Sequence, residues 1–228
     1  MTTPGPIPDG IAPFCDACAE GLSGVADDRA RIERVRDDFC RLLGETELFA
    51  RLLAEIAEGT GPVDLRRPTA FDNELLLYAH PRRLFSLRLY LYEPARFTPV
   101  HDHNSWGLLG PVGGVLEVVG YRREDDGSRP ELARVAPAGR RTLRPAETAS
   151  TLPLDEGIHR VGNPTDRTVA SLSLYGQSLA RGYIQEFDPE TGRVYRILRP
   201  HEKKRMLAAQ ALAALGAGGA PGTGGTRP

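Results

Sequence analysis

The chain has 228 residues, with 29 basic and 30 acidic side chains and a formal net charge of −1. This balance gives no basic surface for a nucleic acid, and no apolar run reaches the roughly 18 residues that a membrane span needs. Three cysteines do not make a disulfide framework, and the first residues lack the features of a secretory signal. We therefore expect a cytoplasmic protein without nucleic-acid or membrane partners; the sequence leaves its oligomeric state open.

The N-terminal quarter is predicted to be helical. Residues 1–13 carry Pro and Gly without periodicity, which indicates a flexible arm, and residues 14–62 form a helical segment. Apolar residues recur at three- and four-residue spacing from Asp27 to Glu58. A break near Gly44 divides this pattern into two helices, with Thr46 as the expected N-cap of the second.

The cysteines fall in the same region. Cys15 and Cys18 form a single CxxC pattern, which lacks the two further ligands of a zinc site and the βαβ context of a thioredoxin-like motif. We expect them to be ordinary reduced cysteines near a first helix. Cys40 falls within a helical pattern and is expected in the core.

Residues 63–200 are predicted to form a β barrel. Short apolar or alternating runs are separated by turns rich in Pro, Gly, Asn and Asp, a pattern typical of an all-β sandwich or barrel. The runs are Leu75–Tyr78, Leu84–Tyr92, Val115–Arg122, Leu132–Val135, Arg141–Leu143, Gly157–Val161, Thr168–Tyr175, Tyr183–Phe187 and Val194–Leu198. Residues 201–228 are predicted to form a short C-terminal helix over Glu202–Leu215, followed by a disordered Gly-rich tail.

Three histidines follow or lie on predicted strands. His101 and His103 come shortly after the run that ends at Tyr92, and on a strand residues i and i+2 point to the same face. Imidazole pairs suit Zn, Cu, Ni or Fe. The spacing alone leaves open whether these are metal ligands or surface histidines near a strand end. His159, on another strand-like run, favours a metal site.

These residues resemble the two-motif pattern of the cupin superfamily. His101-Asp102-His103 is followed about fifty residues later by His159, with Asn163 four positions on. The resemblance implies a double-stranded β-helix, a barrel of the jelly-roll type. The family's glutamate ligand has no counterpart at positions 104–108, and the nearest acid is Glu117 on the next predicted strand. The resemblance therefore implies a site of three histidines with open coordination positions.

Sites of this kind are the mark of thiol dioxygenases such as cysteine dioxygenase and 3-mercaptopropionate dioxygenase. The resemblance spans about Leu75 to Leu198, and includes the segments Phe97–His103, Trp106–Gly110, Ser171–Gly176 and Phe187–Gly192. It implies that Fe(II) binds a small thiol and O2, and that the product is a sulfinic acid. Tyr175 is the expected catalytic phenol, and Trp106 and Leu108 are expected to be apolar walls of the site.

Two departures concern the residues around the metal ligands. Ser171 and Ser173 are expected beside the ligands, and Ser173 stands where the family has a histidine. The family also holds the substrate carboxylate with an early Arg or Gln, which residues 71–78 lack. Arg88 and Arg181 are therefore candidates for binding an anionic substrate. From the residues alone, the alternatives are surface positions for both arginines and a core position for Tyr175.

Three functions remain in competition. The first is an iron(II) thiol dioxygenase that acts on 3-mercaptopropionate, cysteine or a related mercapto acid. The second is another metal-dependent cupin enzyme, such as a dioxygenase that cleaves a carbon–carbon bond or an isomerase. The third is a non-catalytic cupin that binds a small ligand. Metal content and detection of a sulfinate product discriminate among them.

Overall fold

Three helices precede the first strand, in a computed structural model that describes residues 7–217. They are α1 (Ala12–Gly21), α2 (Asp28–Leu43) and α3 (Thr46–Glu58). The Asp27 carboxylate accepts a hydrogen bond of 2.7 Å from the backbone N–H of Ala30 and so caps α2. Gly59, with φ of +69°, ends α3 in the left-handed conformation that glycine adopts at no steric cost.

Two expectations for this region are wrong. Thr46 is the first residue of α3, not its cap: the cap position is Glu45, whose side chain makes no capping bond. The prediction of a flexible arm is wrong for its second half, because α1 begins at Ala12 and Ile11 is fully buried against the helices. Residues 1–6 lie outside the described residues.

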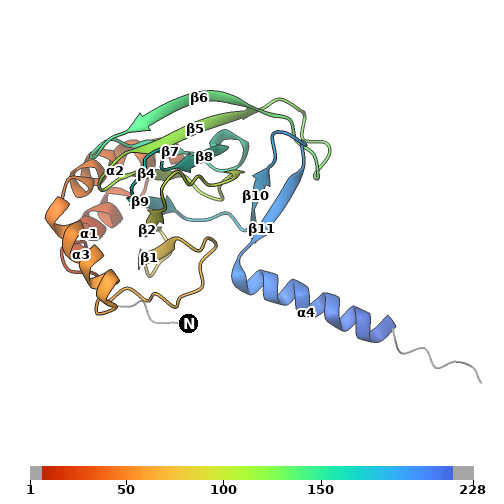
Figure 1. The fold of residues 1–228 in the computed structure, drawn as a ribbon, viewed down its shortest axis with the longest axis horizontal. Coiled ribbons are helices and arrows are strands. Elements are labelled where there is room, and N and C mark those ends of the chain that lie inside the picture. Colours follow the sequence, from red (N-terminus) through yellow and green to blue (C-terminus); the bar gives the residue numbers. More distant parts are fainter. Residues whose placement is uncertain (1–6, 218–228) are drawn as a thin grey trace, which may run out of the picture.

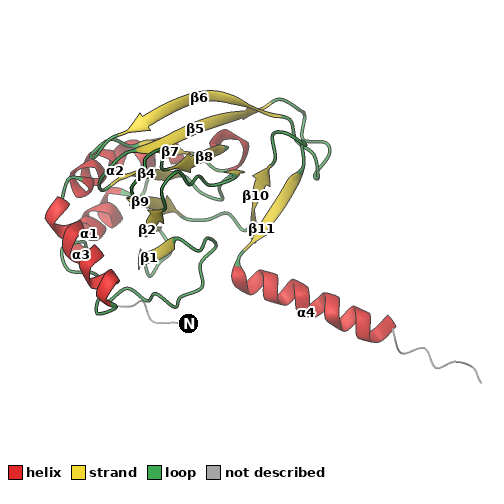
Figure 2. Ribbon diagram, viewed as in Figure 1, coloured by secondary structure: helices red, strands yellow, loops and turns green. Residues whose placement is uncertain are grey.

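The rest of the chain is mostly strands. Eleven are described: β1 (Glu74–Ala79), β2 (Phe85–Tyr92), β3 (Val100–His101), β4 (Gly107–Pro111), β5 (Leu116–Arg123), β6 (Val135–Leu143), β7 (Ala149–Thr151), β8 (His159–Gly162), β9 (Val169–Gly176), β10 (Tyr183–Phe187) and β11 (Val194–Leu198). A short 3-10 helix, Leu154–Gly157, precedes β8. The predicted all-β barrel with N-terminal helices is confirmed, and Figure 2 shows α1, α2 and α3 gathered at one side of the strands.

The strands form two antiparallel sheets that close over one another. One has the order β1-β2-β9-β4-β7 and the other β11-β10-β3-β8-β5-β6. In both, strands from the first half of the barrel alternate with strands from the second half, for example β2-β9-β4-β7 and β10-β3-β8-β5. This alternation is the jelly-roll arrangement, in which the chain winds as a double-stranded β-helix.

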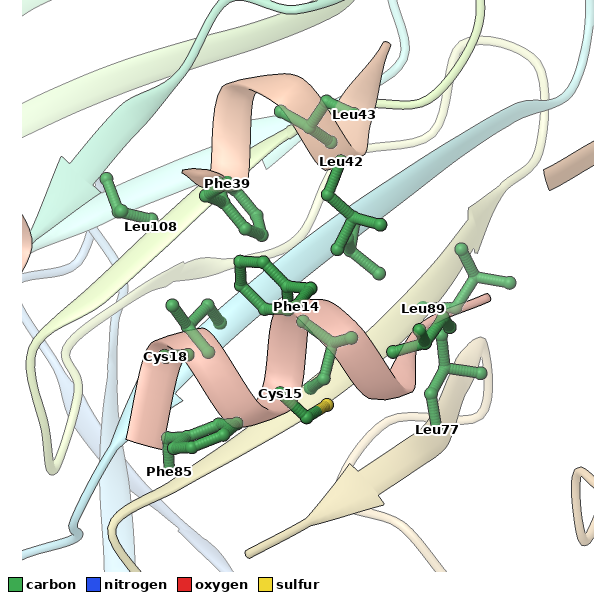
Figure 3. Close-up of a cluster of buried hydrophobic side chains, with 14 of the residues drawn as sticks. Phe14, Cys15, Cys18, Phe39, Leu42, Leu43, Leu77, Phe85, Leu89 and Leu108 are labelled. Atoms are coloured by element: carbon green, nitrogen blue, oxygen red, sulfur yellow. The ribbon is translucent and has the colours of Figure 1, made fainter. Parts of the chain in front are cut away.

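One sheet is buried on both faces. Along β2, Leu87 and Leu89 face the helices, whereas Tyr90 and Tyr92 face the barrel interior. Figure 3 shows side chains of α1 and α2, such as Phe14 and Phe39, meeting those of β1, β2 and β4. Because strand side chains alternate between faces, the polar residues between the outward leucines are directed into the barrel.

Strand β6 corrects one expectation. The sequence predicts two strands separated by a turn at Pro137-Ala138-Gly139, but β6 is continuous from Val135 to Leu143. It is the edge strand of its sheet, and an edge position tolerates proline because no neighbour needs its missing N–H. The pairing register of β5 and β6 shifts between Gly120 and Tyr121, and this shift accommodates the irregular segment of β6.

The final described element is α4 (Pro200–Ala217), which extends away from the barrel in Figure 1. Its side chains from Lys203 to Leu215 are exposed. The predicted Gly-rich tail, residues 218–228, lies outside the described residues. None of the helices in residues 7–217 has the length and apolar character needed to cross a membrane.

Candidate metal centre

His101 and His159 are brought together by strand pairing. His101 ends β3 and His159 begins β8, and these two residues face each other across the antiparallel pair. The Nδ1–H of His101 donates a hydrogen bond of 2.9 Å to the backbone carbonyl of Pro99. This bond fixes the tautomer and leaves the Nε2 lone pair of His101 free for a ligand.

His103 completes a cluster whose ligand atoms all lie within 4.8 Å of one another. Its Nε2 lies 2.9 Å from Nε2 of His159. Two imidazole lone pairs this close repel unless a proton or a cation lies between them. All three histidines are buried, and burial lowers the pKa of each; the neighbouring imidazoles lower that of His103 further. Three neutral, convergent nitrogens are a donor set that fits a transition metal.

The expectation that strand alternation places His103 is wrong, because β3 ends at His101. A loop held from several sides places it instead. The N–H of Asp102 donates 3.0 Å to the carbonyl of Gln185, and the carbonyl of His103 accepts 2.8 Å from the N–H of Leu154. Hydrogen bonds to two separate parts of the chain therefore fix the loop that carries this ligand.

Arg181 is part of that support and does not line the cavity beside the cluster. Its Nη2 donates 2.8 Å to Oδ1 of Asp102, and its Nε donates 2.7 Å to the side-chain oxygen of Asn104. Both partners flank His103 in the sequence. The prediction that Arg181 binds substrate is therefore replaced by a structural role. The sequence did hold a signal for this role, because Asp102 and Asn104 on either side of His103 are polar, and polar groups that become buried need hydrogen-bond partners.

Tyr175 lies next to the cluster, on β9. Its ring is stacked on that of His103, with centroids 5.5 Å apart and an interplanar angle of 25°. Burial raises the pKa of Tyr175, while hydrogen bonding to Ser173 and Tyr90 acts in the opposite direction. Its phenol is therefore protonated at neutral pH and can donate a hydrogen bond. Tyr90 was not predicted as a site residue, although the alternation along β2 directs its side chain into the barrel.

The two serines lie on the inner face of β9, as the resemblance implies. Both line a small cavity together with His101, His159 and Tyr175. The Ser171 hydroxyl donates 3.1 Å to the carbonyl of Gly110, so it is occupied in joining β9 to β4.

A cavity of about 390 Å³ opens beside the cluster. His103, Tyr175 and Arg88 line its inner part, and Arg88 forms an ion pair with Glu74, a buried residue of β1. The structure thus places Arg88 where a substrate would lie. Glu74 occupies the early-strand segment where the sequence showed no arginine.

Trp106 and Leu108 do not form walls of this cavity. Both are buried in the cluster that joins the helices to the first sheet, on the outer side of the barrel. Trp106 fills the space behind Gly176, where an added Cβ would come within 2.1 Å of the indole Nε1. The prediction of Trp106 as a substrate-binding residue is therefore wrong, because the end of the loop before β4 directs its side chain towards the core.

Comparison with known proteins gives partial likenesses at low sequence identity. No family model matches the sequence. A Cupin 2 conserved barrel domain protein from Salinispora arenicola is 18% identical, with a TM-score of 0.36 over 50% of this chain and 85% of the other. A sugar phosphate isomerase of the cupin superfamily from Silicibacter pomeroyi is 16% identical, with a TM-score of 0.34 over 60% and 85%. The capsular polysaccharide assembling protein CapF from Staphylococcus aureus is 12% identical, with a TM-score of 0.36 over 59% and 34%.

These likenesses cover only part of the chain, and the strand order is the stronger observation about the fold. The interleaved jelly-roll order brings His101 on β3 opposite His159 on β8 inside the barrel. The chain has the cupin fold. Within this cupin barrel, the three histidines form the one cluster of three or more potential ligand residues in the described part of the chain.

Proposed function

We propose that this cupin is an iron(II) thiol dioxygenase, which converts a small thiol and O2 into a sulfinic acid. The observation that carries the proposal is the cluster of three neutral imidazoles without a carboxylate, beside the Tyr175 phenol. Glu117, the first acid after His103 in the sequence, belongs to β5 and lies 3.6 Å from Arg140, outside the cluster. Three nitrogen ligands leave coordination positions open for a thiol and for O2.

His101, His103 and His159 would hold the metal. When bound, ferrous iron supplies the acidification of the thiol and the activation of O2, so that RSH and O2 together give RSO2H. The chain's own contribution is to fix these groups in place. The Tyr175 hydroxyl would donate a hydrogen bond towards the reacting atoms, with Ser173 and Tyr90 holding its orientation.

The test is oxygen uptake by protein loaded with Fe(II) under anaerobic conditions. We expect one O2 consumed for each thiol, and a product that mass spectrometry shows to be heavier by two oxygen atoms. Protein loaded with Zn(II) is the control, since zinc has no redox chemistry. Absence of uptake with every small thiol, or a disulfide as the sole product, would contradict the proposal.

A further inference from the structure

The outer part of the 390 Å³ cavity is lined by arginines that have no acidic partner. Arg67, Arg83 and Arg199 all line it. Within residues 7–217, none of the three forms an ion pair. We call these three residues the arginine rim. Guanidinium groups are suited to carboxylate and phosphate because their donors match two oxygens at once.

The inner part of the cavity has a different charge balance. Glu74 is the one acidic side chain among the described residues that line the cavity, and it is already paired with Arg88. A carboxylate close to the histidines would share Arg88 with Glu74 and so would lie beside another negative charge. Short mercapto acids, whose sulfur and carboxylate are two or three atoms apart, are therefore poorly matched to this interior.

The size of the cavity agrees with a longer ligand. Its volume falls in the range of roughly 300–1,000 Å³ found for small-molecule sites, and a three-carbon mercapto acid would fill only a small part of it. The cavity is also continuous from His103 and Tyr175 to the rim, since all of these residues line it together.

We infer that the substrate is a thiol with an extended tail that ends in an anionic group. The sulfur lies at the three histidines, the tail passes Tyr175 and the Arg88–Glu74 pair, and the anion binds at the arginine rim. This inference rests on the proposed dioxygenase function and adds the chemical class of its substrate. It shifts recognition of the anion from the interior of the barrel to the mouth of the cavity.

Binding is tested without turnover, on metal-free protein. The probes are the S-methyl ethers of 6-mercaptohexanoate and 6-mercaptohexanol, which have the same chain length and end in a carboxylate and an uncharged hydroxyl, respectively. We expect the carboxylate to bind about tenfold more tightly by calorimetry in low salt, and the difference to shrink as salt increases. Equal affinity of the two probes would overturn the inference.

Substitutions assign the effect to the rim. Arg67→Gln, Arg83→Gly and Arg199→Gln should each weaken binding of the carboxylate probe and leave the alcohol probe unchanged. Arg83 has φ of +59°, so glycine removes its charge while relieving an unfavourable backbone conformation. Arg82→Gln is the matched control, since Arg82 is the neighbouring residue and does not line the cavity. Rim variants that behave like Arg82→Gln would overturn the inference.

Turnover provides the second arm. With Fe(II), 6-mercaptohexanoate should give a higher kcat/KM than 3-mercaptopropionate, and Glu74→Gln should raise the value for 3-mercaptopropionate by freeing Arg88. A thermal melt of Glu74→Gln verifies that it is folded. If no thiol is oxidised but the carboxylate probe still binds at the rim, the dioxygenase function fails and the anion site stands. If thiols are oxidised without regard to tail charge or length, the dioxygenase function stands and this inference fails.

Discussion

Arg181 holds the carboxylate of Asp102 through a hydrogen bond of 2.8 Å between Nη2 and Oδ1. Asp102 has no exposed surface, and its Oδ2 has no hydrogen-bond partner among the described residues. Burial raises the pKa of Asp102, while the Arg181 guanidinium and the Gln185 N–H act against that rise. Asp102 lies between His101 and His103 in the sequence, so its pairing with Arg181 connects the β9–β10 loop to the candidate centre.

Removing Arg181 should therefore damage both stability and metal binding. Arg181→Met leaves Asp102 buried without its positive partner, a change that typically costs about 3–5 kcal/mol of unfolding free energy. Metal affinity should fall by roughly 10- to 100-fold, as it does when a residue supporting a ligand is lost. Urea unfolding and metal titration measure the two effects. Arg193→Met, at an exposed arginine, is the control, and adding Asp102→Asn to Arg181→Met should recover part of the stability.

The ligands themselves should matter more for metal content than any supporting residue. His103→Gln or His159→Gln leaves two nitrogens in the cluster, so we expect a loss of affinity beyond the roughly 10- to 100-fold seen for supporting residues. Metal analysis after dialysis checks this. His80→Gln should keep full metal content, because His80 packs against Tyr78 and Phe85 away from the cluster. Retention of metal by both cluster variants would show that the histidines are not ligands.

Tyr175→Phe should separate catalysis from metal binding. The ring that stacks on His103 is kept and only the hydroxyl is lost. We expect metal content to be unchanged and kcat to fall by about 100-fold or more, the usual range for loss of a proton-donating group. Tyr78→Phe, on β1 and outside the cavity, should retain full activity. An equal effect of both variants would indicate a general loss of packing.

The histidine cluster should make the metal-free protein sensitive to acid. Because the pKa of each imidazole is lowered in the folded state, the unfolded chain binds protons that the folded protein does not once the pH falls below about 6.5. This stability is fully present above pH 6.5 and is lost as the pH falls, by up to about 1.4 kcal/mol per pH unit for each proton. Urea unfolding of chelator-treated protein at several pH values measures the slope. A double variant, His103→Gln with His159→Gln, should show a smaller slope, and an unchanged slope would assign the sensitivity to other groups.

Cys15 and Cys18 should be inert in the folded protein. Both side chains are buried on α1, and burial raises the pKa of each thiol to about 12. The thiolate is the reactive form, so iodoacetamide at pH 8 should leave both unmodified until the protein is denatured. Mass spectrometry of native and denatured samples gives the answer. Rapid labelling of either cysteine in the native protein would contradict this packing.

Alternating patterns were predictable from the sequence, and irregular strands were not. β2 and β9 carry long alternations that fill both the barrel and the interface with the helices, so their runs were found nearly to the residue. β4 was missed because it contains Gly107, Gly110 and Pro111, which locally indicate a turn. An added Cβ at Gly110 would lie 2.4 Å from the carbonyl of Glu147, so the glycine is required by the neighbouring chain and not by a turn.

The candidate site also has one part that could be predicted from the sequence and one part that could not. The three histidines were predicted from the spacing of His101 and His103 together with the resemblance to the cupin pattern that includes His159. The supporting contacts were not, because Arg181 lies 79 residues from Asp102 and only the folded barrel brings them together. Trp106 was misplaced for a related reason: its side chain follows the loop that carries His103, and the face on which it lies depends on where β3 ends.

The opposition of His101 and His159 also determines when the metal can bind during synthesis. The two histidines lie on strands that are far apart in the sequence and meet through the β3–β8 pair. A nascent chain that has exposed His101 and His103 on the ribosome still lacks the third nitrogen and the strand that aligns it. A metal ion held by all three nitrogens would therefore bind only after the strands of both halves of the barrel have paired.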